Sequence, residues 1–483
     1  MSNTTQMSAR TRIESILDDS SFVEFGAKVT ARATDFNLRE KAAPSDGVIT
    51  GYGVINGNLV YVYSQDAAVL NGSMGEMHAK KIVGLYDLAM KMGAPVIGLI
   101  DCAGIRLQEA TDALNGFGEI YKKMSLASGV VPQITAVYGN CGGGLAVLTA
   151  LSDFTFVEET NGKLYVNTPN ALAENNDTKL DTASAKFQAE AGMADFTGDE
   201  EAIANGVRQL VSMLPANNED NDSYSDCQDD LNRACADMSA EIADASLALT
   251  DIADDGLFIE VKSAFAKDMV TGFLKVNGTT IGAVANRTAV FDDNGEKAEE
   301  FEPVLTVDGA EKAAEFINFC DSFEIPVLSL TNVKGFEATV CAEKYIAKAV
   351  AKLTYAFANA TVPKVNVITG EAYGSAYVAM NSKAVGADVT LAWDNASIGM
   401  MDASLAAKIM YADEINAAED VNSVISKKAS EYAQLQSSVE SAAARGYVDT
   451  IIPAEDTRKY VAAAFEMLFT KREDRPVKKH GTV

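Results

Sequence analysis

The chain repeats itself once along its 483 residues. Four short patterns of the first half return in the second half, in the same order and about 220 to 236 residues later. One such match could arise by chance, but four collinear matches predict a duplicated domain, and the period is far too long for a solenoid. The matching pairs are residues 18–25 with 254–261, 49–57 with 270–278, 94–97 with 325–328, and 131–139 with 362–370.

The boundary between the two copies is expected within residues 214–250. The run 217–222 in that segment is polar and acidic, which is typical of a linker. The prediction assigns residues 1–240 to the first domain and residues 241–483 to the second.

Each half shows the same alternation of strands and helices, which indicates an α/β fold with a layered sheet. The pattern begins with a hairpin around a TGxxxxxG motif, in which Asn56-Gly57 forms the turn. The elements expected in the first half are strands at 47–54 and 59–63, a helix at about 77–92, a strand at 95–100, a helix at about 116–128 and a strand at 134–138.

Charge and composition exclude several classes of function. The net charge of −28 argues against nucleic acid or an anionic membrane surface as a partner. The six cysteines form no CxxC pair, the start of the chain lacks the apolar core of a signal peptide, and no stretch is apolar enough for a membrane span. His78 and His480 are the only histidines, so we expect no metal and no histidine-based mechanism, in a cytoplasmic protein.

A glycine-rich turn follows an apolar strand in the first half. It contains Gly142, Gly143 and Gly144, and it opens a helix expected over Leu145–Leu151. Backbone N–H groups at such a helix start are unpaired and lie at the positive end of the helix dipole, so they can stabilise an oxyanion. Close packing of the helix on the strand is the alternative interpretation.

The second half places a similar turn at the equivalent point. There the sequence from Gly370 to Ala376 again follows an apolar strand. Two oxyanion sites suit a reaction between two carbonyl-bearing partners that each pass through an enolate-like state. A hydratase or isomerase would instead need a pair of carboxylates, for which Glu109 and Glu119 are the candidates.

A third candidate motif is the loop from Asp101 to Glu109. It follows a strand, at the edge where open α/β sheets bind ligands. Arg106 has two interpretations here: an ion pair with Glu109 or Asp112, or support of a ligand phosphate.

These motifs resemble the carboxyltransferase subunits of biotin-dependent acyl-CoA enzymes. That group includes the β subunits of propionyl-CoA carboxylases and the α subunits of methylmalonyl-CoA and glutaconyl-CoA decarboxylases. The resemblance extends from Phe22 to about Tyr460. It rests on residues 66–76, 103–109 and 131–154 in the first half, and on residues 284–286, 310–321 and 373–377 in the second.

The resemblance implies two tandem crotonase-like (ClpP/crotonase) domains. The first would be the acyl-CoA side and the second the biotin side, with each active site formed between two neighbouring subunits. The implied oxyanion donors are the backbone N–H groups of Gly143, Gly144, Ser375 and Ala376. The implied acyl-CoA contacts are Ala103, Gly104, Arg106 and Gly142, and the implied biotin contacts are Phe336, Tyr373 and Gly374.

The resemblance also implies cofactors and partners. Biotin would be carried by a separate protein or domain, a coenzyme A thioester would be the substrate, and the chain would form a dimer or a trimer of dimers. Its partners would be a biotin carboxyl carrier protein and either a biotin carboxylase subunit or membrane decarboxylase subunits, the latter giving peripheral membrane attachment. The α subunit of a sodium-pumping acyl-CoA decarboxylase is slightly favoured, because the chain lacks carboxylase and carrier regions. The alternatives are the β subunit of an acetyl- or propionyl-CoA carboxylase, a biotin-independent crotonase-type hydratase or isomerase, and a non-catalytic scaffold.

The second half departs from the family pattern at several positions. Gly370 and Glu371 stand where a basic pair is common, and Ser375 replaces the second of two glycines. Lys334 and Asp394 stand where prolines are usual. These differences concern the biotin side and leave the acyl substrate open.

Overall fold

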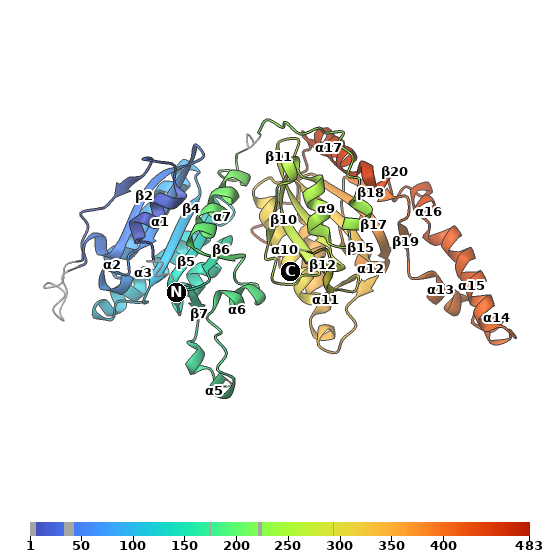
Figure 1. Ribbon diagram of the computed structural model, residues 1–483, viewed down its shortest axis with the longest axis horizontal. Coiled ribbons are helices and arrows are strands. Elements are labelled where there is room, and N and C mark those ends of the chain that lie inside the picture. Colours follow the sequence, from blue (N-terminus) through green and yellow to red (C-terminus); the bar gives the residue numbers. More distant parts are fainter. Residues whose placement is uncertain (1–5, 33–42, 174, 221–224, 293) are drawn as a thin grey trace. The chain divides into compact units, whose positions relative to one another are not determined.

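The computed structural model describes residues 6–32, 43–173, 175–220, 225–292 and 294–483. The chain forms two compact units, Met1–Ser223 and Tyr224–Val483. Each unit has its own sheet with helices packed against it (Figure 1).

The first unit is built on an eight-stranded sheet. Its strand order is β1-β2-β3-β4-β5-β6-β8, with β7 paired to β5 beside β6. The β1–β2 and β2–β3 pairs are antiparallel, and the remaining pairs are parallel. The strands are β1 Val23–Phe25, β2 Val48–Ile55, β3 Asn58–Gln65, β4 Val96–Cys102, β5 Gln133–Gly142, β6 Phe154–Glu158, β7 Lys163–Tyr165 and β8 Phe196–Gly198.

The sheet of the second unit repeats this topology strand for strand. Its order is β9-β10-β11-β15-β17-β18-β20, with β19 paired to β17, and the antiparallel and parallel pairs fall at the same places. Its strands are β9 Phe258–Val261, β10 Met269–Val276, β11 Thr279–Asn286, β15 Val327–Val333, β17 Lys364–Tyr373, β18 Val389–Trp393, β19 Ser397–Gly399 and β20 Thr450–Ile452. Two small sheets pair β12 Ala289–Phe291 with β13 Lys297–Glu300, and β14 Val304–Leu305 with β16 Gly335–Phe336.

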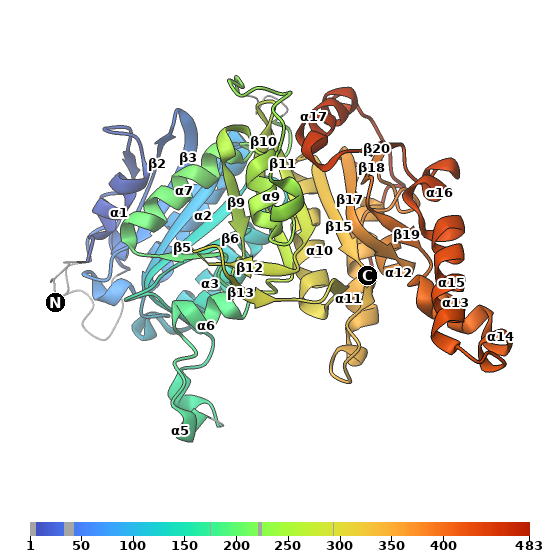
Figure 2. The ribbon, with the colours of Figure 1, turned by 45° about the vertical axis from the view of Figure 1, so that its right-hand side comes forward.

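The helices follow the duplication as well. In the first unit α2 packs against α3 and α1 against α7, while in the second α10 packs against α11 and α9 against α17. Helices α13–α15 lie between β19 and β20 in the chain and extend away from the second sheet (Figure 2). The first unit contains α1 Ala9–Ile16, α2 Glu76–Met92, α3 Ala110–Ala127, α4 Gly144–Ala150, α5 Asn175–Thr178, α6 Ala185–Glu190 and α7 Glu200–Met213. The second contains α8 Met238–Glu241, α9 Ala245–Ile252, α10 Val307–Ser322, α11 Ile346–Asn359, α12 Gly374–Ala379, α13 Ala403–Met410, α14 Ala412–Asn416, α15 Val421–Tyr432, α16 Val439–Ala444 and α17 Thr457–Leu468.

Individual side chains also recur between the two units. Asp18 accepts the N–H groups of the β2–β3 hairpin turn, and Asp254 accepts those of the β10–β11 turn. Arg208 on α7 donates to Asp18 Oδ1 at 2.8 Å, and Arg458 on α17 donates to Asp254 Oδ1 at the same distance. The duplication is therefore present in side-chain contacts as well as in topology.

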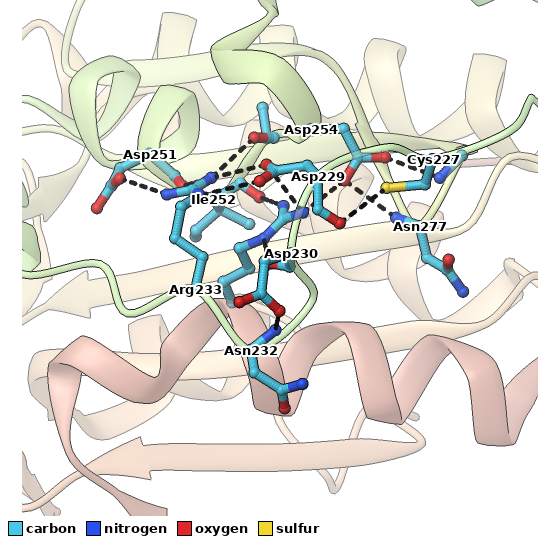
Figure 3. A network of polar contacts seen from close by, with 12 residues as sticks. Cys227, Asp229, Asp230, Asn232, Arg233, Asp251, Ile252, Asp254 and Asn277 are labelled. Carbon is cyan, nitrogen blue, oxygen red and sulfur yellow. Dashed lines mark hydrogen bonds and ion pairs between the residues drawn. The ribbon is translucent and has the colours of Figure 1, made fainter.

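Arg458 has a second set of contacts that Arg208 lacks. It pairs with Asp229 at 3.1 Å and donates to the backbone oxygen of Asp230, both near the start of the second unit. Arg233 of the same segment pairs with Asp251 at the end of α9 (Figure 3). Two arginines thus hold the segment 229–233 against the rest of the second unit.

The structure confirms the α/β fold with two related domains. The expected hairpin, the helix at 77–92 and the strand at 95–100 are β2–β3, α2 and β4. Two elements differ from the prediction: α3 begins at Ala110, and β5 continues to Gly142 through most of the glycine-rich turn. Within the described residues, no helix is both long enough and apolar enough to cross a bilayer.

Candidate active site

The junction of β5 and α4 is the first candidate oxyanion site. Gly143 joins the two elements with φ 61° and ψ −121°, a conformation that favours glycine. A Cβ atom placed there would meet nothing within 4 Å, so the space beside this residue is open. Its own N–H group donates to the Tyr165 oxygen of β7 at 2.9 Å. The N–H groups of Gly144 and Leu145 follow in the first turn of α4, where no intrahelical carbonyl reaches them.

The flanking glycines are required for packing. A Cβ at Gly142 would lie 2.7 Å from the Tyr165 ring. At Gly144 a Cβ would lie 2.9 Å from the hydroxyl oxygen of Tyr121 and 3.2 Å from the ring of Phe117. Close packing, the alternative interpretation of the turn, therefore applies at Gly142 and Gly144, while the space beside Gly143 is open.

The junction of β17 and α12 in the second unit has a glycine of similar φ at the equivalent position. Gly374 has φ 62°, and the next two N–H groups, of Ser375 and Ala376, lie in the first turn of α12. Ser375 is exposed and Ala376 is buried.

Matching the two glycines shifts the expected donors by one residue. Gly143 and Gly374 share their φ and each follows a long strand paired to a three-residue strand. The counterparts of Ser375 and Ala376 are then Gly144 and Leu145 rather than Gly143 and Gly144. In the structure the Gly143 N–H donates to the Tyr165 oxygen, while the N–H groups of Gly144 and Leu145 lie in the first turn of α4.

The loop after β4 is held by backbone hydrogen bonds. Ala103 donates its N–H to the Asn71 oxygen at 3.1 Å, and the Gly104 oxygen accepts the Met74 N–H at 2.9 Å. A Cβ at Gly104, which has φ 102°, would meet nothing within 4 Å. Ala103 is exposed and Gly104 is half-buried, so both are accessible for contact with a ligand.

Arg106 is not accessible to a ligand, which corrects the expectation of a phosphate contact. Its side chain is 1% exposed, and Nη1 lies 2.5 Å from Asp46 Oδ1 and 2.8 Å from Glu109 Oε1. Its Nη2 donates to the Ser73 oxygen at 2.6 Å. The ion pair with Glu109 is the interpretation that holds, and the arginine supports the loop from inside the unit.

Asp46, which belongs to this network, and His78, which lies beside it, are both buried. Burial raises the pKa of Asp46, and Arg106 opposes that rise. Burial lowers the pKa of His78 to about 3, and the nearby Arg106 charge adds to the effect. His78 is therefore a neutral core residue, with its Nε2 3.2 Å from Gln65 Nε2.

The biotin contacts implied by the resemblance lie around α12. Strand β16, which carries Phe336, contacts α12. Tyr373 is the residue just before α12. Burial raises the pKa of the Tyr373 hydroxyl, and the charges of Glu371 and Asp402 add to the rise. The departure Lys334 forms an ion pair with Glu302 at 3.3 Å, while Phe336 remains 37% exposed.

The carboxylates that a hydratase would need are not set up for catalysis. Glu109 is buried, pairs with Arg106 and accepts the Glu76 N–H at 2.7 Å. Glu119 lies on α3, where Asn115 of the preceding turn donates to it. Among the described residues, no group of three or more His, Cys, Asp or Glu side chains is arranged to hold a metal ion.

Comparison with known proteins decides the family. Residues 3–483 match the model of the carboxyl transferase domain. The chain belongs to the carboxyl transferase family. This confirms the resemblance inferred from the sequence, and with it the prediction of an acyl-CoA carboxyltransferase.

Individual carboxyltransferases resemble the chain over nearly its whole length. It is 38% identical to the methylmalonyl-CoA decarboxylase α subunit of Propionigenium modestum, over 99% of this chain and 93% of that protein. It is 39% identical to a putative propionyl-CoA carboxylase β chain of Bacillus subtilis, over 99% and 94%. The structure matches a transcarboxylase 12S crystal structure with methylmalonyl-CoA and methylmalonic acid bound, at a TM-score of 0.91 and 36% identity, over 99% and 92% of the two chains.

Sequence reasoning missed two tyrosines around the first candidate site. Tyr121 donates its hydroxyl to the Gly144 oxygen at 2.5 Å, and Tyr165 accepts from Gly143. The sequence offered no signal for either contact, because one tyrosine lies on an amphipathic helix and the other on a three-residue strand.

Proposed function

We propose that the chain transfers a carboxyl group between biotin on a separate carrier and a short acyl-CoA of the propionyl or methylmalonyl type. The observation that carries this proposal is the pair of equivalent strand–glycine–helix junctions in one duplicated chain. Each junction offers uncharged backbone donors, and the transfer has two carbonyl groups that gain negative charge. Relatives named for propionyl-CoA and methylmalonyl-CoA over 99% of the chain support the acyl group.

On the acyl-CoA side, α4 would bind the thioester oxygen. The N–H groups of Gly144 and Leu145 would donate to it as it gains charge, aided by the positive end of the helix dipole. Ala103 and Gly104 would contact the coenzyme A moiety from the neighbouring loop. Arg106 holds that loop in place.

On the biotin side, the N–H groups of Ser375 and Ala376 would donate to the ureido oxygen. Bound biotin supplies the site that carries the carboxyl group between partners. Gly374 suits this turn through its φ of 62° and through packing, since a Cβ there would lie 3.2 Å from the Met400 oxygen. Phe336 and Tyr373 would flank the ring.

The chain's own groups position reactants and stabilise charge rather than move protons. His78 is neutral and buried, and Glu109 is tied to Arg106. Catalysis would then come from holding two substrates in register and from preorganised donors. We expect no metal in this reaction.

Within this class we propose the α subunit of a sodium-pumping decarboxylase, with the β subunit of an acetyl- or propionyl-CoA carboxylase as the alternative. Relatives of both kinds share 38% and 39% identity with the chain. The partners would be a biotin carboxyl carrier protein and either membrane decarboxylase subunits or a biotin carboxylase. The chain would be cytoplasmic, with peripheral attachment to a membrane in the decarboxylase case.

We also propose a homo-oligomer, a dimer or a trimer of dimers, with active sites between copies. The matched transcarboxylase 12S is described as a hexamer assembly, which supports this expectation. Mass measurement of the purified protein in solution tests it directly, and an active monomer would contradict it.

The decisive experiment measures CO₂ release from methylmalonyl-CoA, malonyl-CoA and glutaconyl-CoA, each with and without biocytin. Biocytin-dependent release is expected, and the fastest substrate identifies the acyl group. Release that does not depend on biocytin would favour a hydratase-like enzyme with side activity. An assembled protein that binds coenzyme A but releases nothing would favour the scaffold. Co-purification with membrane subunits or with a biotin carboxylase separates the two physiological roles.

A further inference from the structure

Helix α12 ends on a cluster of four buried polar side chains, Ser329, Thr331, Asn366 and Asn381, which we call the amide–hydroxyl cluster. All four are 0% exposed. Thr331 lies on β15, Asn366 lies on β17, and Asn381 is the second residue after α12. Asn366 Oδ1 accepts hydrogen bonds from Thr331 at 2.7 Å and from Ser329 at 3.0 Å.

The amide–hydroxyl cluster holds the C-terminal end of the helix. The Met380 oxygen, just after the last residue of α12, accepts from Asn366 Nδ2 at 3.4 Å and lies 3.3 Å from Thr331 Oγ1, whose one hydrogen is shared between this oxygen and the nearer Asn366 Oδ1. Asn381 donates to Ser329 Oγ at 3.0 Å and has φ 51°, in the left-handed region. A helix of six residues has little stability of its own, so contacts at its ends determine where it lies.

The first unit shows that the fold does not need this cluster. Strand register pairs Val96 with Gln133 and Val327 with Lys364, which makes Gly98, Ile100 and Thr135 the counterparts of Ser329, Thr331 and Asn366. A Cβ at Gly98 would lie 2.4 Å from the Tyr63 hydroxyl oxygen, so an aromatic side chain occupies that space instead. The same strands and the same turn are built there with a largely different interior.

Burying polar groups is costly unless they are fully paired. Asn381 Oδ1 is buried with no hydrogen-bond partner among the described residues, so the cluster retains part of that cost. A polar interior that the fold does not require, located under one of two equivalent helices, indicates a role specific to that helix.

We propose that the amide–hydroxyl cluster positions α12 so that the Ser375 and Ala376 N–H groups meet the biotin-side acceptor. The four side chains are positioning residues, since the contacts that they make lie at the C-terminal end of α12. This inference rests on the proposed function, because it presumes that α12 serves the biotin side.

The test compares Thr331→Val with Thr331→Ser in the full-length assembled protein. The valine keeps the shape and removes the hydroxyl, while the serine keeps the hydroxyl. Misplacing α12 by a fraction of an ångström should lower kcat/KM for biocytin on the order of tenfold in Thr331→Val, and Thr331→Ser should restore it. KM for methylmalonyl-CoA should not change in either variant.

Asn381→Gly provides an independent variant, since glycine adopts the left-handed conformation without strain but lacks the amide. It should lower kcat/KM for biocytin in the same way, and it decides the question if Thr331→Val does not assemble. Thr149→Val is the reciprocal control. Its hydroxyl donates to the Leu145 oxygen at 3.0 Å on α4, so its loss should alter the parameters for methylmalonyl-CoA instead.

The outcomes are distinguishable. A wild-type protein without biocytin-dependent transfer overturns the proposed function and this inference with it. An active wild type, combined with variants whose biocytin and acyl-CoA parameters fall equally or not at all, overturns the positioning role alone.

Discussion

Nη1 of Arg106 lies 2.8 Å from Oε1 of Glu109, with both side chains at most 1% exposed. The same nitrogen also lies 2.5 Å from Asp46 Oδ1. One guanidinium therefore serves two buried carboxylates, and it joins the turn before β2, the start of α2 and the loop after β4. Each carboxylate has Arg106 as its counter-charge. Arg106, by contrast, keeps one carboxylate partner when the other is removed.

This asymmetry predicts unequal costs for the two partners. Arg106→Met leaves two buried carboxylates without a counter-charge and should cost about 3 to 5 kcal/mol of unfolding free energy. Glu109→Gln leaves the Arg106–Asp46 pair intact and should cost about 1 to 2 kcal/mol. Urea unfolding of the purified variants measures both, with the exposed Glu119→Gln as control. If Glu109→Gln abolished turnover without loss of stability, Glu109 would be a catalytic group and the hydratase alternative would return.

Tyr121→Phe tests the support of α4 from α3. The phenylalanine keeps the ring and loses the hydrogen bond to the Gly144 oxygen, which is worth about 0.5 to 1.5 kcal/mol. We expect kcat/KM for methylmalonyl-CoA to fall by about threefold to tenfold, with the KM for biocytin unchanged. Steady-state kinetics with each substrate varied in turn provides the measurement. An equal change in both KM values would argue against a local role for this hydroxyl.

Gly143→Ala tests the positive φ at the open turn. No atom lies in the way of the new Cβ, so the loss arises from backbone strain, on the order of 1 to 3 kcal/mol. Gly57→Ala is the matched control, because Gly57 has φ 83° in the β2–β3 hairpin and its Cβ would also meet nothing within 4 Å. Both variants should lose thermal stability, and only Gly143→Ala should also lose carboxyl transfer. Full activity in Gly143→Ala would show that the oxyanion site does not lie at this turn.

The lowered pKa of the buried His78 predicts that the stability of the protein depends on pH. Its pKa is about 3 in the folded protein and about 6.5 in the unfolded chain. Below pH 6.5 the unfolded chain therefore binds a proton that the folded protein does not, and stability falls by about 1.4 kcal/mol per pH unit down to pH 3. Urea midpoints measured at pH 7 and pH 5 should converge more closely in His78→Gln than in the wild type. The exposed His480→Gln should keep the wild-type slope, and a His78 variant that also keeps it would contradict the assignment.

The sequence was sufficient for what depends on local pattern. The TGxxxxxG motifs predicted the hairpins because the last glycine of each motif, Gly57 or Gly278, forms the turn with a positive φ of 83° or 75°. Helix α2 was predicted within one residue because its apolar spacing is regular and Gly93 ends it with φ 61°. The order of the four repeated patterns was enough to predict two related domains.

Contacts between distant residues could not be predicted. Asp46 lies sixty positions before Arg106, and no local pattern connects them. The start of α3 was missed because Glu109 caps it without a side-chain hydrogen bond. The partner of the Gly143 N–H was missed because β7 is only three residues long and is defined by its pairing with β5.

The matching φ angles of Gly143 and Gly374 have a consequence for how the two halves differ. Side chains around the two turns have diverged, from Tyr63 and Gly98 in one interior to Ser329 and Asn366 in the other, while the backbone of the turn has not. The two halves therefore share the backbone of the turn, and the differences between them lie in the residues behind it.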